Sequence, residues 1–360
     1  MVIAEGSITA LYLFDVAEEA DLAAVPRLLQ AQASPARLAP KPFTPAYVQY
    51  QHPPIVLDGE ALQLSGLSPL RARVKIFDYG VISFALSQPV SGGWDDLAAI
   101  GERLGALETQ VQGWCDQLRM QLDSCLVKSR EPLLSEDYLV YAVTQLDQPV
   151  TADAMLKTDG DAIVSLLLGE RQQLSRQQRE RILRRRISYL ADDLVIPVWN
   201  AAFVYDTEAG VQAALEIFEF ANSQLLQFRY YDALLDTELG RIYDSLEDPR
   251  WYHSLAGQRY VRAAQQLHAL FIDVNELTDK TENALKMVGD VYAARLYSLV
   301  AGRLGLDRWK QNVEEKLDTL DDIYRFTVDQ TQMSRGHLLE LTIILILILE
   351  LVLFFLGIMK

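Results

Sequence analysis

The amino-acid sequence predicts an α+β protein with a ferredoxin-like N-terminal head, an all-helical middle with an antiparallel coiled-coil hairpin, and a single C-terminal transmembrane helix. Three observations lead to this prediction. Residues 71–86 alternate apolar and polar side chains as half-buried strands do. Beyond residue 151 the apolar residues recur at helical and then at heptad spacing. Residues 341–359 form an apolar run with one charge, and about 20 such residues span a bilayer as a helix.

The head is predicted to cover residues 1–150. In chain order we expect a strand at 7–16, a helix at 18–29, two strands or one bent strand at 71–86, an amphipathic helix at 94–126 and a strand at 138–143. A proline-rich surface segment up to Pro54 and a short strand at 55–57 precede residue 71. Gly80 marks either the turn between two strands or a bulge in one. The order β-α-β-β-α-β is that of a ferredoxin-like split sandwich.

Residues 151–250 are predicted to form a helical domain without strands. Ser175 and Gln178 have the S-x-x-Q spacing of a capping box, which begins a helix whose apolar stripe runs to Leu194. Pro197 ends this helix because proline cannot continue it, and a loop is expected to follow. A second helix is expected from about Glu208 to Leu246.

Residues 251–335 are predicted to form a coiled-coil hairpin, or stalk, because apolar and small residues alternate in steps of three and four. The first arm has Leu267, Leu270, Val274, Leu277, Thr281, Ala284, Val288 and Val291; the second has Val313, Leu317, Leu320, Tyr324 and Thr327. Gly302 and Gly305 would make the turn between the antiparallel arms. The alternative is two ordinary core helices.

Residues 337–360 are predicted to be a membrane anchor, with 338–359 in the lipid bilayer. The alternative is a helix buried in a soluble core, but such a helix normally keeps a polar face. The acidic N-terminus lacks both the basic region of a secretory signal and the arginines of a transit peptide. A tail-anchored protein with a cytoplasmic N-terminal body is therefore expected.

Composition excludes some classes of function. The formal net charge of −16 argues against general nucleic-acid binding, which needs a basic surface. Cys115 and Cys125 are the two cysteines, too few for a disulfide framework and compatible with a reducing cytosol. No phosphate-binding, dinucleotide-binding, nucleophile-elbow or zinc motif occurs, and the four histidines are scattered. We therefore predict no catalytic, cofactor-binding or metal-binding residues; an enzyme with an unrecognised site is the alternative.

A local basic segment stands out in this acidic chain. It contains seven arginines: Arg171, Arg176, Arg179, Arg181, Arg184, Arg185 and Arg186. On a helix, Arg181, Arg184 and Arg185 fall in one sector away from the apolar stripe. Such a surface suits the phosphates of RNA or of lipid head groups. The alternative is a solvated face paired with the surplus carboxylates of the chain.

Glu350 lies near the middle of the predicted anchor. A carboxyl at this depth costs about 2.5–3.5 kcal/mol on insertion scales, but when protonated it can donate a hydrogen bond to a neighbouring helix. We predict a homo-oligomer whose assembly weakens in Glu350→Leu, although that change makes the anchor more apolar. Oligomer size in mild detergent tests this, and equal assembly of both forms would support the alternative of a tolerated, protonated side chain.

Four stretches of the chain resemble a family of membrane-anchored proteins, the required-for-meiotic-nuclear-division family. They are KIFDYGVISF (75–84), LSRQQRERILRRRISYLADDL (174–194), VWNAAFVYDTEAGVQAALEIFEFANSQLLQFRYYDALLD (198–236) and HLLELTIILILILELV (337–352). The likeness covers about residues 70–355. It departs at 196–206, where family members carry a D-T-P-x-F-F-W-E-like segment. The resemblance implies no established enzyme activity, and mitochondrial members support translation at the inner membrane. Because this chain lacks a transit peptide, it resembles a bacterial-type member, and the resemblance favours the bacterial plasma membrane over an organelle inner membrane.

Two functional hypotheses follow. In the first, the chain is a membrane-tethered scaffold or adaptor that holds a cytoplasmic partner, such as the translation machinery, near the membrane. In the second, it is a subunit of an oligomeric transport or ion-handling assembly. RNA or ribosome contact would favour the first, and a conducting oligomer would favour the second. The sequence identifies no small-molecule substrate.

Overall fold

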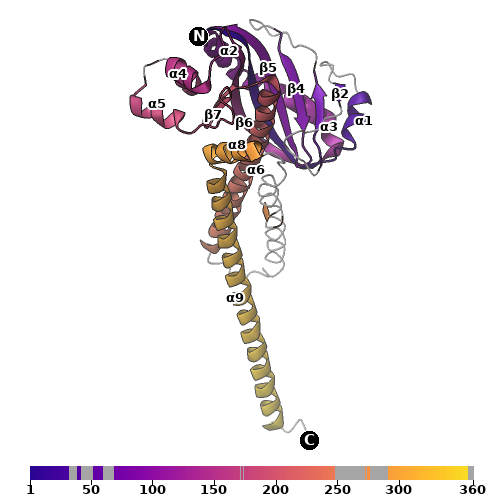
Figure 1. The fold of residues 1–360 in the computed structure, drawn as a ribbon. Coiled ribbons are helices and arrows are strands. Elements are labelled where there is room, and N and C mark those ends of the chain that lie inside the picture. The colour runs from indigo at the N-terminus through magenta and orange to yellow at the C-terminus, as the bar shows by residue number, and fades with distance from the viewer. Residues whose placement is uncertain are drawn as a thin grey trace. The chain divides into compact units, whose positions relative to one another are not determined.

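The computed structural model describes residues 1–31, 39–41, 52–59, 69–170, 172, 174–247, 272, 274–275 and 291–355. They form an α+β structure with one eight-stranded mixed sheet. Figure 1 shows the sheet together with its helices. The chain divides into two compact units, Met1–Tyr230 with Leu277–Trp309 and Tyr231–Glu276 with Lys310–Lys360. The predicted α+β class is confirmed; the ferredoxin-like assignment of the head stays a prediction.

The strands are β1 (Ile3–Ala20), β2 (Ala39–Lys41), β3 (Ile55–Asp58), β4 (Arg71–Ile76), β5 (Val81–Gly92), β6 (Leu126–Leu146), β7 (Leu194–Pro197) and β8 (Ala201–Tyr205). The helices are α1 (Val25–Ala31), α2 (Trp94–Gly105), α3 (Glu108–Leu122), α4 (Ala152–Leu168), α5 (Arg176–Leu183), α6 (Glu208–Glu247), α8 (Val291–Leu304) and α9 (Leu306–Phe355), with a 3-10 turn at Asp123–Cys125.

The sheet order is β2-β3-β4-β5-β1-β6-β8-β7. Every neighbouring pair is antiparallel except β6 and β8, which run parallel. A parallel neighbour needs a crossover connection, and α4 and α5 lie in the chain between β6 and the β7–β8 hairpin. The predicted boundary at residue 150 thus falls between strands of one sheet.

The long central strand β1 pairs with β5 on one side and β6 on the other. Its alternate residues Tyr12, Phe14 and Val16 are buried on one face, in a core that also contains Leu97 and Leu104 of α2 and Val111 of α3. Alternation of period two is what directs one set of side chains to each face. This face supplies the apolar core, because aromatic and aliphatic side chains from strands and helices meet there.

The prediction of two strands in residues 71–86 is confirmed. Strands β4 and β5 form a hairpin with its turn at Phe77–Gly80. Gly80 has φ +73°, which suits glycine, and its carbonyl accepts hydrogen bonds from Val16 N at 2.9 Å and Ala17 N at 3.3 Å. The turn is therefore tied to the neighbouring strand β1.

The single helix predicted at 94–126 is wrong, because the segment forms two helices. Helix α2 ends at Gly105, and α3 begins at Glu108. Glycine is a poor helix former, and the break lets α3 bury its own stripe of Val111, Cys115 and Leu118 against the core. The predicted helix at 18–29 is likewise shorter, since β1 continues to Ala20.

The prediction of no strand after residue 151 is also wrong. Helix α5 stops at Leu183, and β7 and β8 occupy residues predicted as helix end and loop. Every residue of both strands is buried. A strand covered on both faces has a continuous apolar sequence without alternation, so its pattern resembles that of a buried helix.

In the second unit, α9 continues from Lys310 onward. Lys316 Nζ lies 2.7 Å from both Asp232 Oδ1 and Asp236 Oδ1 of α6. The predicted seam residues Val313, Leu317 and Leu320 are buried, and Gly305, with φ +70°, separates α8 from α9, whereas Gly302 lies inside α8. The first predicted arm falls almost wholly outside the described residues, so the coiled coil stays a prediction. Among the described residues, no helix meets the length and apolarity needed for a membrane span.

Candidate functional site

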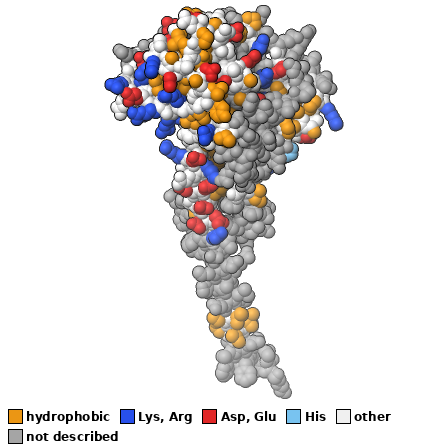
Figure 2. Space-filling view, viewed as in Figure 1, with side chains coloured by type: hydrophobic (Ala, Val, Ile, Leu, Met, Phe, Trp, Pro, Cys, Tyr) orange, Lys and Arg blue, Asp and Glu red, His pale blue; other side chains and the backbone are white. Residues whose placement is uncertain are grey.

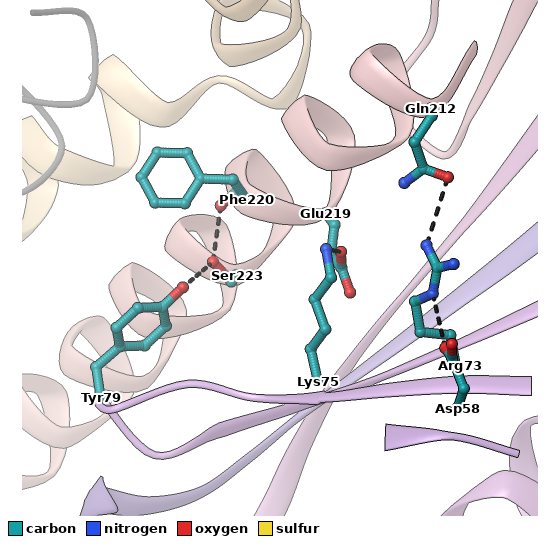
Figure 3. Close-up of polar contacts among 8 residues, drawn as sticks. All are labelled: Asp58, Arg73, Lys75, Tyr79, Gln212, Glu219, Phe220 and Ser223. Carbon is teal, nitrogen blue, oxygen red and sulfur yellow. Dashed lines mark hydrogen bonds and ion pairs between the residues drawn. The ribbon is translucent and has the colours of Figure 1, made fainter. Parts of the chain in front are cut away.

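The first half of α6 covers the second face of the sheet, and β4 contributes charged residues to this face. In β4 the side chains alternate, so that Ala72, Val74 and Ile76 enter the apolar core while Arg71, Arg73 and Lys75 share the opposite face. Figure 3 shows Arg73 and Lys75 directed from the sheet toward α6. Three cations on alternate positions of one strand therefore define this surface.

Lys75 forms a buried ion pair with α6. Its Nζ lies 2.5 Å from Glu219 Oε2, and the side chains are 2% and 5% exposed. The neighbouring Glu216 is also buried; its pKa is raised by burial, against the attraction of Lys75, and its Oε2 has no hydrogen-bond partner among the described residues. One lysine thus stands close to two carboxyl groups in a region that excludes most water.

Polar contacts flank this pair on both sides (Figure 3). Arg73 Nε donates to Asp58 Oδ1 at 3.1 Å, and its Nη1 donates to Gln212 Oε1 at 3.4 Å. The Tyr79 hydroxyl lies 2.9 Å from Ser223 Oγ, and burial raises the pKa of Tyr79 well above its usual value. Together these bonds fix α6 against β4 and its turn.

A cavity of about 670 Å³ opens between the sheet and the start of α6. Apart from Ala72, the residues that line it come from the same face of β1, β4 and β5, from the end of β3 and from one face of α6. On the helix the lining positions Glu208, Val211, Gln212, Leu215 and Glu219 recur at steps of three and four, as one helical face requires. The cavity lies wholly within the first unit.

The predicted arginine surface lies on α5 and the residues that follow it. Ser175 Oγ accepts a hydrogen bond from Gln178 N at 3.2 Å, which confirms the predicted N-cap. Arg181, Arg184 and Arg185 are exposed, and Figure 2 shows Lys and Arg side chains gathered over α4 and α5. Arg184 Nη2 lies 3.5 Å from Glu180 Oε2. No carboxylate of a described residue lies within ion-pairing distance of Arg181 or Arg185.

Arg303 of α8 adds a fourth positive charge to this surface. Its Nε donates to Pro197 O at 2.9 Å, and its Nη2 is buried without a hydrogen-bond partner among the described residues. Its pKa is lowered, first by burial and then by repulsion from Arg185 and Arg181. Three guanidinium groups therefore repel one another here, and a bound anion would relieve that repulsion.

Exposed aromatic side chains lie in the segments that adjoin these arginines. Trp199, in the turn between β7 and β8, is 71% exposed, and Tyr189 is 72% exposed. Tyr189 contacts Tyr292 of α8 at a ring-centroid distance of 5.7 Å. We call Arg181, Arg184, Arg185, Arg303, Tyr189 and Trp199 the arginine surface. Helical spacing predicted Arg181, Arg184 and Arg185 as members of this surface. Arg303, Tyr189 and Trp199 were not predicted, because they lie outside α5 and join the surface only through the fold.

The structure also places the two cysteines and bears on the predictions about metal binding and Glu350. Cys115 and Cys125 are both free and buried. Across the described part of the chain, no group of three or more histidine, cysteine or acidic residues could hold a metal ion. The side chain of Glu350 lies outside the described residues, so its predicted role in assembly stays a prediction. The buried Lys75–Glu219 pair was not predicted, since its members are far apart in the sequence.

Comparison with known proteins identifies relatives of the head. The family model described as "Uncharacterized protein MJ0711, N-terminal domain" matches residues 5–212. Uncharacterized protein MJ0711 of Methanocaldococcus jannaschii is 25% identical over 230 residues, which cover 64% of this chain and 69% of that protein. No solved structure gives a significant match.

These comparisons do not show the likeness to the required-for-meiotic-nuclear-division family, which stays a prediction. The matched residues 5–212 contain the eight-stranded sheet, except for the first two residues of β1, and the first turn of α6. They also include α5 and much of the lining of the cavity. Because the match spans more than half of the chain, the protein belongs to the family defined by the N-terminal domain of uncharacterized protein MJ0711.

Proposed function

We propose that the protein is a membrane-tethered adaptor that holds a phosphate-bearing cytoplasmic partner near the bilayer. The arginine surface carries the partner half of this proposal. Arg181 and Arg185 are exposed and repel a half-buried Arg303, while the chain as a whole has a net charge of −16. A cluster of like charges in an otherwise acidic protein is stabilised by binding an anion. The nearby exposed rings of Trp199 and Tyr189 suit stacking on unpaired bases, which favours an RNA-containing partner.

The tether half of the proposal is supported by the end of α9. Six consecutive apolar side chains, Ile343–Ile348, are each 50–62% exposed, and Figure 2 shows them as an apolar group on this helix. Exposed apolar groups all around a helix are costly in water and favourable in lipid. The apolar sequence continues on both sides of this segment, from Leu338 to Met359.

Replacing Arg181, Arg184 and Arg185 with glutamine should weaken binding of single-stranded RNA by about tenfold or more without changing thermal unfolding. Each lost phosphate contact should also reduce the salt dependence, by about 0.7 in the slope of log K against log salt. Fluorescence anisotropy with a labelled RNA at several salt concentrations measures both effects. Glutamine at Arg27, Arg103 and Arg308, which are exposed elsewhere, is the control of equal charge change. If both triple variants bind alike, the arginine surface is only a solvated face.

Deleting residues 338–360 should move the protein from the membrane fraction to the soluble fraction, because the apolar segment is the proposed anchor. Fractionation followed by carbonate extraction measures this for the full chain and the deletion. The full chain should resist extraction, and protease added outside sealed cells should spare its N-terminal body. A full-length chain that is released by carbonate would contradict the tether.

A further inference from the structure

We propose that the cavity between the sheet and α6 binds a small hydroxylated anion, of the sugar-phosphate or sugar-acid class. This inference is independent of the proposed adaptor function, since the cavity and the arginine surface share no residue. At about 670 Å³ the cavity falls in the range of small-molecule sites, which is roughly 300–1,000 Å³.

The space exists because the sheet carries small side chains where α6 crosses it. Ser7 and Thr9 of β1 and Ala85 and Ser87 of β5 point to this face, where larger residues would fill the gap. Along β5 the residues on this face open progressively, from a buried Ser83 through partly exposed Ala85 and Ser87 to an exposed Pro89. The cavity is thus a depression in the surface, and the Lys75–Glu219 pair closes its inner end.

Three cations and three carboxylates line the cavity, and one of each, Arg71 and Glu208, is not paired with a described residue. Arg73 is bonded to Asp58, and Lys75 is paired with Glu219. Arg71, on the same face of β4, lines the cavity, is exposed, and has no ion pair or hydrogen bond with a described residue. A guanidinium presents a planar fork of donors that matches a carboxylate or phosphate in two parallel bonds. The oxyanion of the ligand is therefore assigned to Arg71.

The rest of the lining suits a hydroxylated body. The hydroxyls of Thr9 and Ser87 lie 2.8 Å apart, and Ser7 adds a third hydroxyl; each of these groups can both donate and accept. Gln212 accepts from Arg73 and also forms a side-chain hydrogen bond with Glu216, and the carboxylate of Glu208 offers further acceptors. Leu11, Val211 and Leu215 supply apolar contact for carbon–hydrogen faces. Sugar hydroxyls need this mixture of donors, acceptors and apolar surface.

Other anions fit this cavity less well. Inorganic phosphate alone would occupy a small part of about 670 Å³ and leave the hydroxyl groups without a contact to the ligand. None of the described residues that line the cavity is aromatic, so a nucleotide base would have no ring to stack on. Glu208, which also lines the cavity, disfavours a ligand with more than one anionic group. A single oxyanion on a polar, non-aromatic scaffold matches best.

Isothermal titration calorimetry of the full-length chain in mild detergent tests the proposal. The probes are glucose 6-phosphate and gluconate. The controls are glucose, which has the hydroxyl groups without an anionic group, and inorganic phosphate, which has the anionic group without the sugar. We expect saturable binding of at least one of the two probes, about tenfold or more tighter than the binding of glucose or of inorganic phosphate. The stronger probe identifies the oxyanion as phosphate or carboxylate. Binding of neither probe more tightly than glucose and inorganic phosphate would overturn the proposal.

Two variants locate the binding in the cavity. Arg71→Gln should weaken the stronger probe by about tenfold or more, whereas Arg176→Gln, an exposed arginine on α5, should leave it unchanged. Ala85→Leu should also abolish binding, because the larger side chain fills the cavity from the sheet side. Thermal unfolding of each variant verifies its fold. Binding by Arg71→Gln equal to that of the unmodified chain would overturn the assignment, and RNA binding by the same variant should stay intact.

Discussion

Lys75→Met is expected to lower the free energy of unfolding by about 3–5 kcal/mol, the largest effect that we predict for a single residue. The replacement removes the cation from a pair whose members are 2% and 5% exposed. Glu219 would then be a buried carboxylate without its counter-charge, next to Glu216, whose pKa burial already raises. Urea unfolding of the purified chain, followed by circular dichroism, measures the loss.

The double variant Lys75→Met with Glu219→Leu is the matched control. Replacing both members of a buried ion pair with apolar residues of similar size is often nearly neutral, because no charge remains to be desolvated. We therefore expect the double variant to regain most of the stability that the single variant loses. A single variant as stable as the unmodified chain would mean that water reaches this pair and that the region below α6 is open.

Gly80→Ala is expected to cost about 3 kcal/mol or more, because two separate penalties add at this turn. A side chain at φ +73° is strained, and its Cβ would lie 2.0 Å from Ala17 O, a backbone atom that cannot move aside. The collision would separate the hairpin turn from β1, which now donates two hydrogen bonds to the Gly80 carbonyl. The midpoint of thermal unfolding should fall accordingly.

Gly169→Ala separates the two penalties. Gly169 also has a positive φ, +61°, at the end of α4, but no atom lies within 4 Å of the position of an added Cβ. Only the backbone strain of about 1–2 kcal/mol should appear there. Equal losses in Gly80→Ala and Gly169→Ala would show that the approach of the turn to β1 is looser than the structure indicates.

The sequence predicted those parts of the fold whose side chains alternate between two environments. Residues 71–86 have a polar face and an apolar face, so β4, β5 and the turn at Gly80 could be expected. Strands β7 and β8 could not, because the environment of their side chains is apolar on both faces and the sequence lacks a period of two. A helix and a buried strand then have the same apolar sequence, and Pro197 suggested the end of a helix.

The two candidate sites also differ in how far the sequence could predict them. The exposure of Arg181, Arg184 and Arg185 follows from helical spacing, which is local. The cavity depends on Gln212 and Glu219 lying opposite Arg73 and Lys75, and these residues are more than a hundred positions apart in the chain. The small residues Ser7, Thr9, Ala85 and Ser87 did not predict a cavity, because a small side chain on a sheet leaves a gap only if the element above it does not fill the space. Only the placement of α6 makes them a cavity.

The parallel pairing of β6 with β8 has a consequence for any shorter form of this protein. The hairpin β7–β8 pairs with Leu139–Val143 of β6, and it is contributed by residues 194–205 after a crossover of about fifty residues. A fragment that stops at residue 150 would leave the backbone N–H and C=O groups of Leu139–Val143 open to pairing with another chain. Such a fragment should aggregate through this unprotected edge, while one that extends through Tyr205 should not. The natural chain thus protects its own β6 edge only after synthesis has passed residue 205.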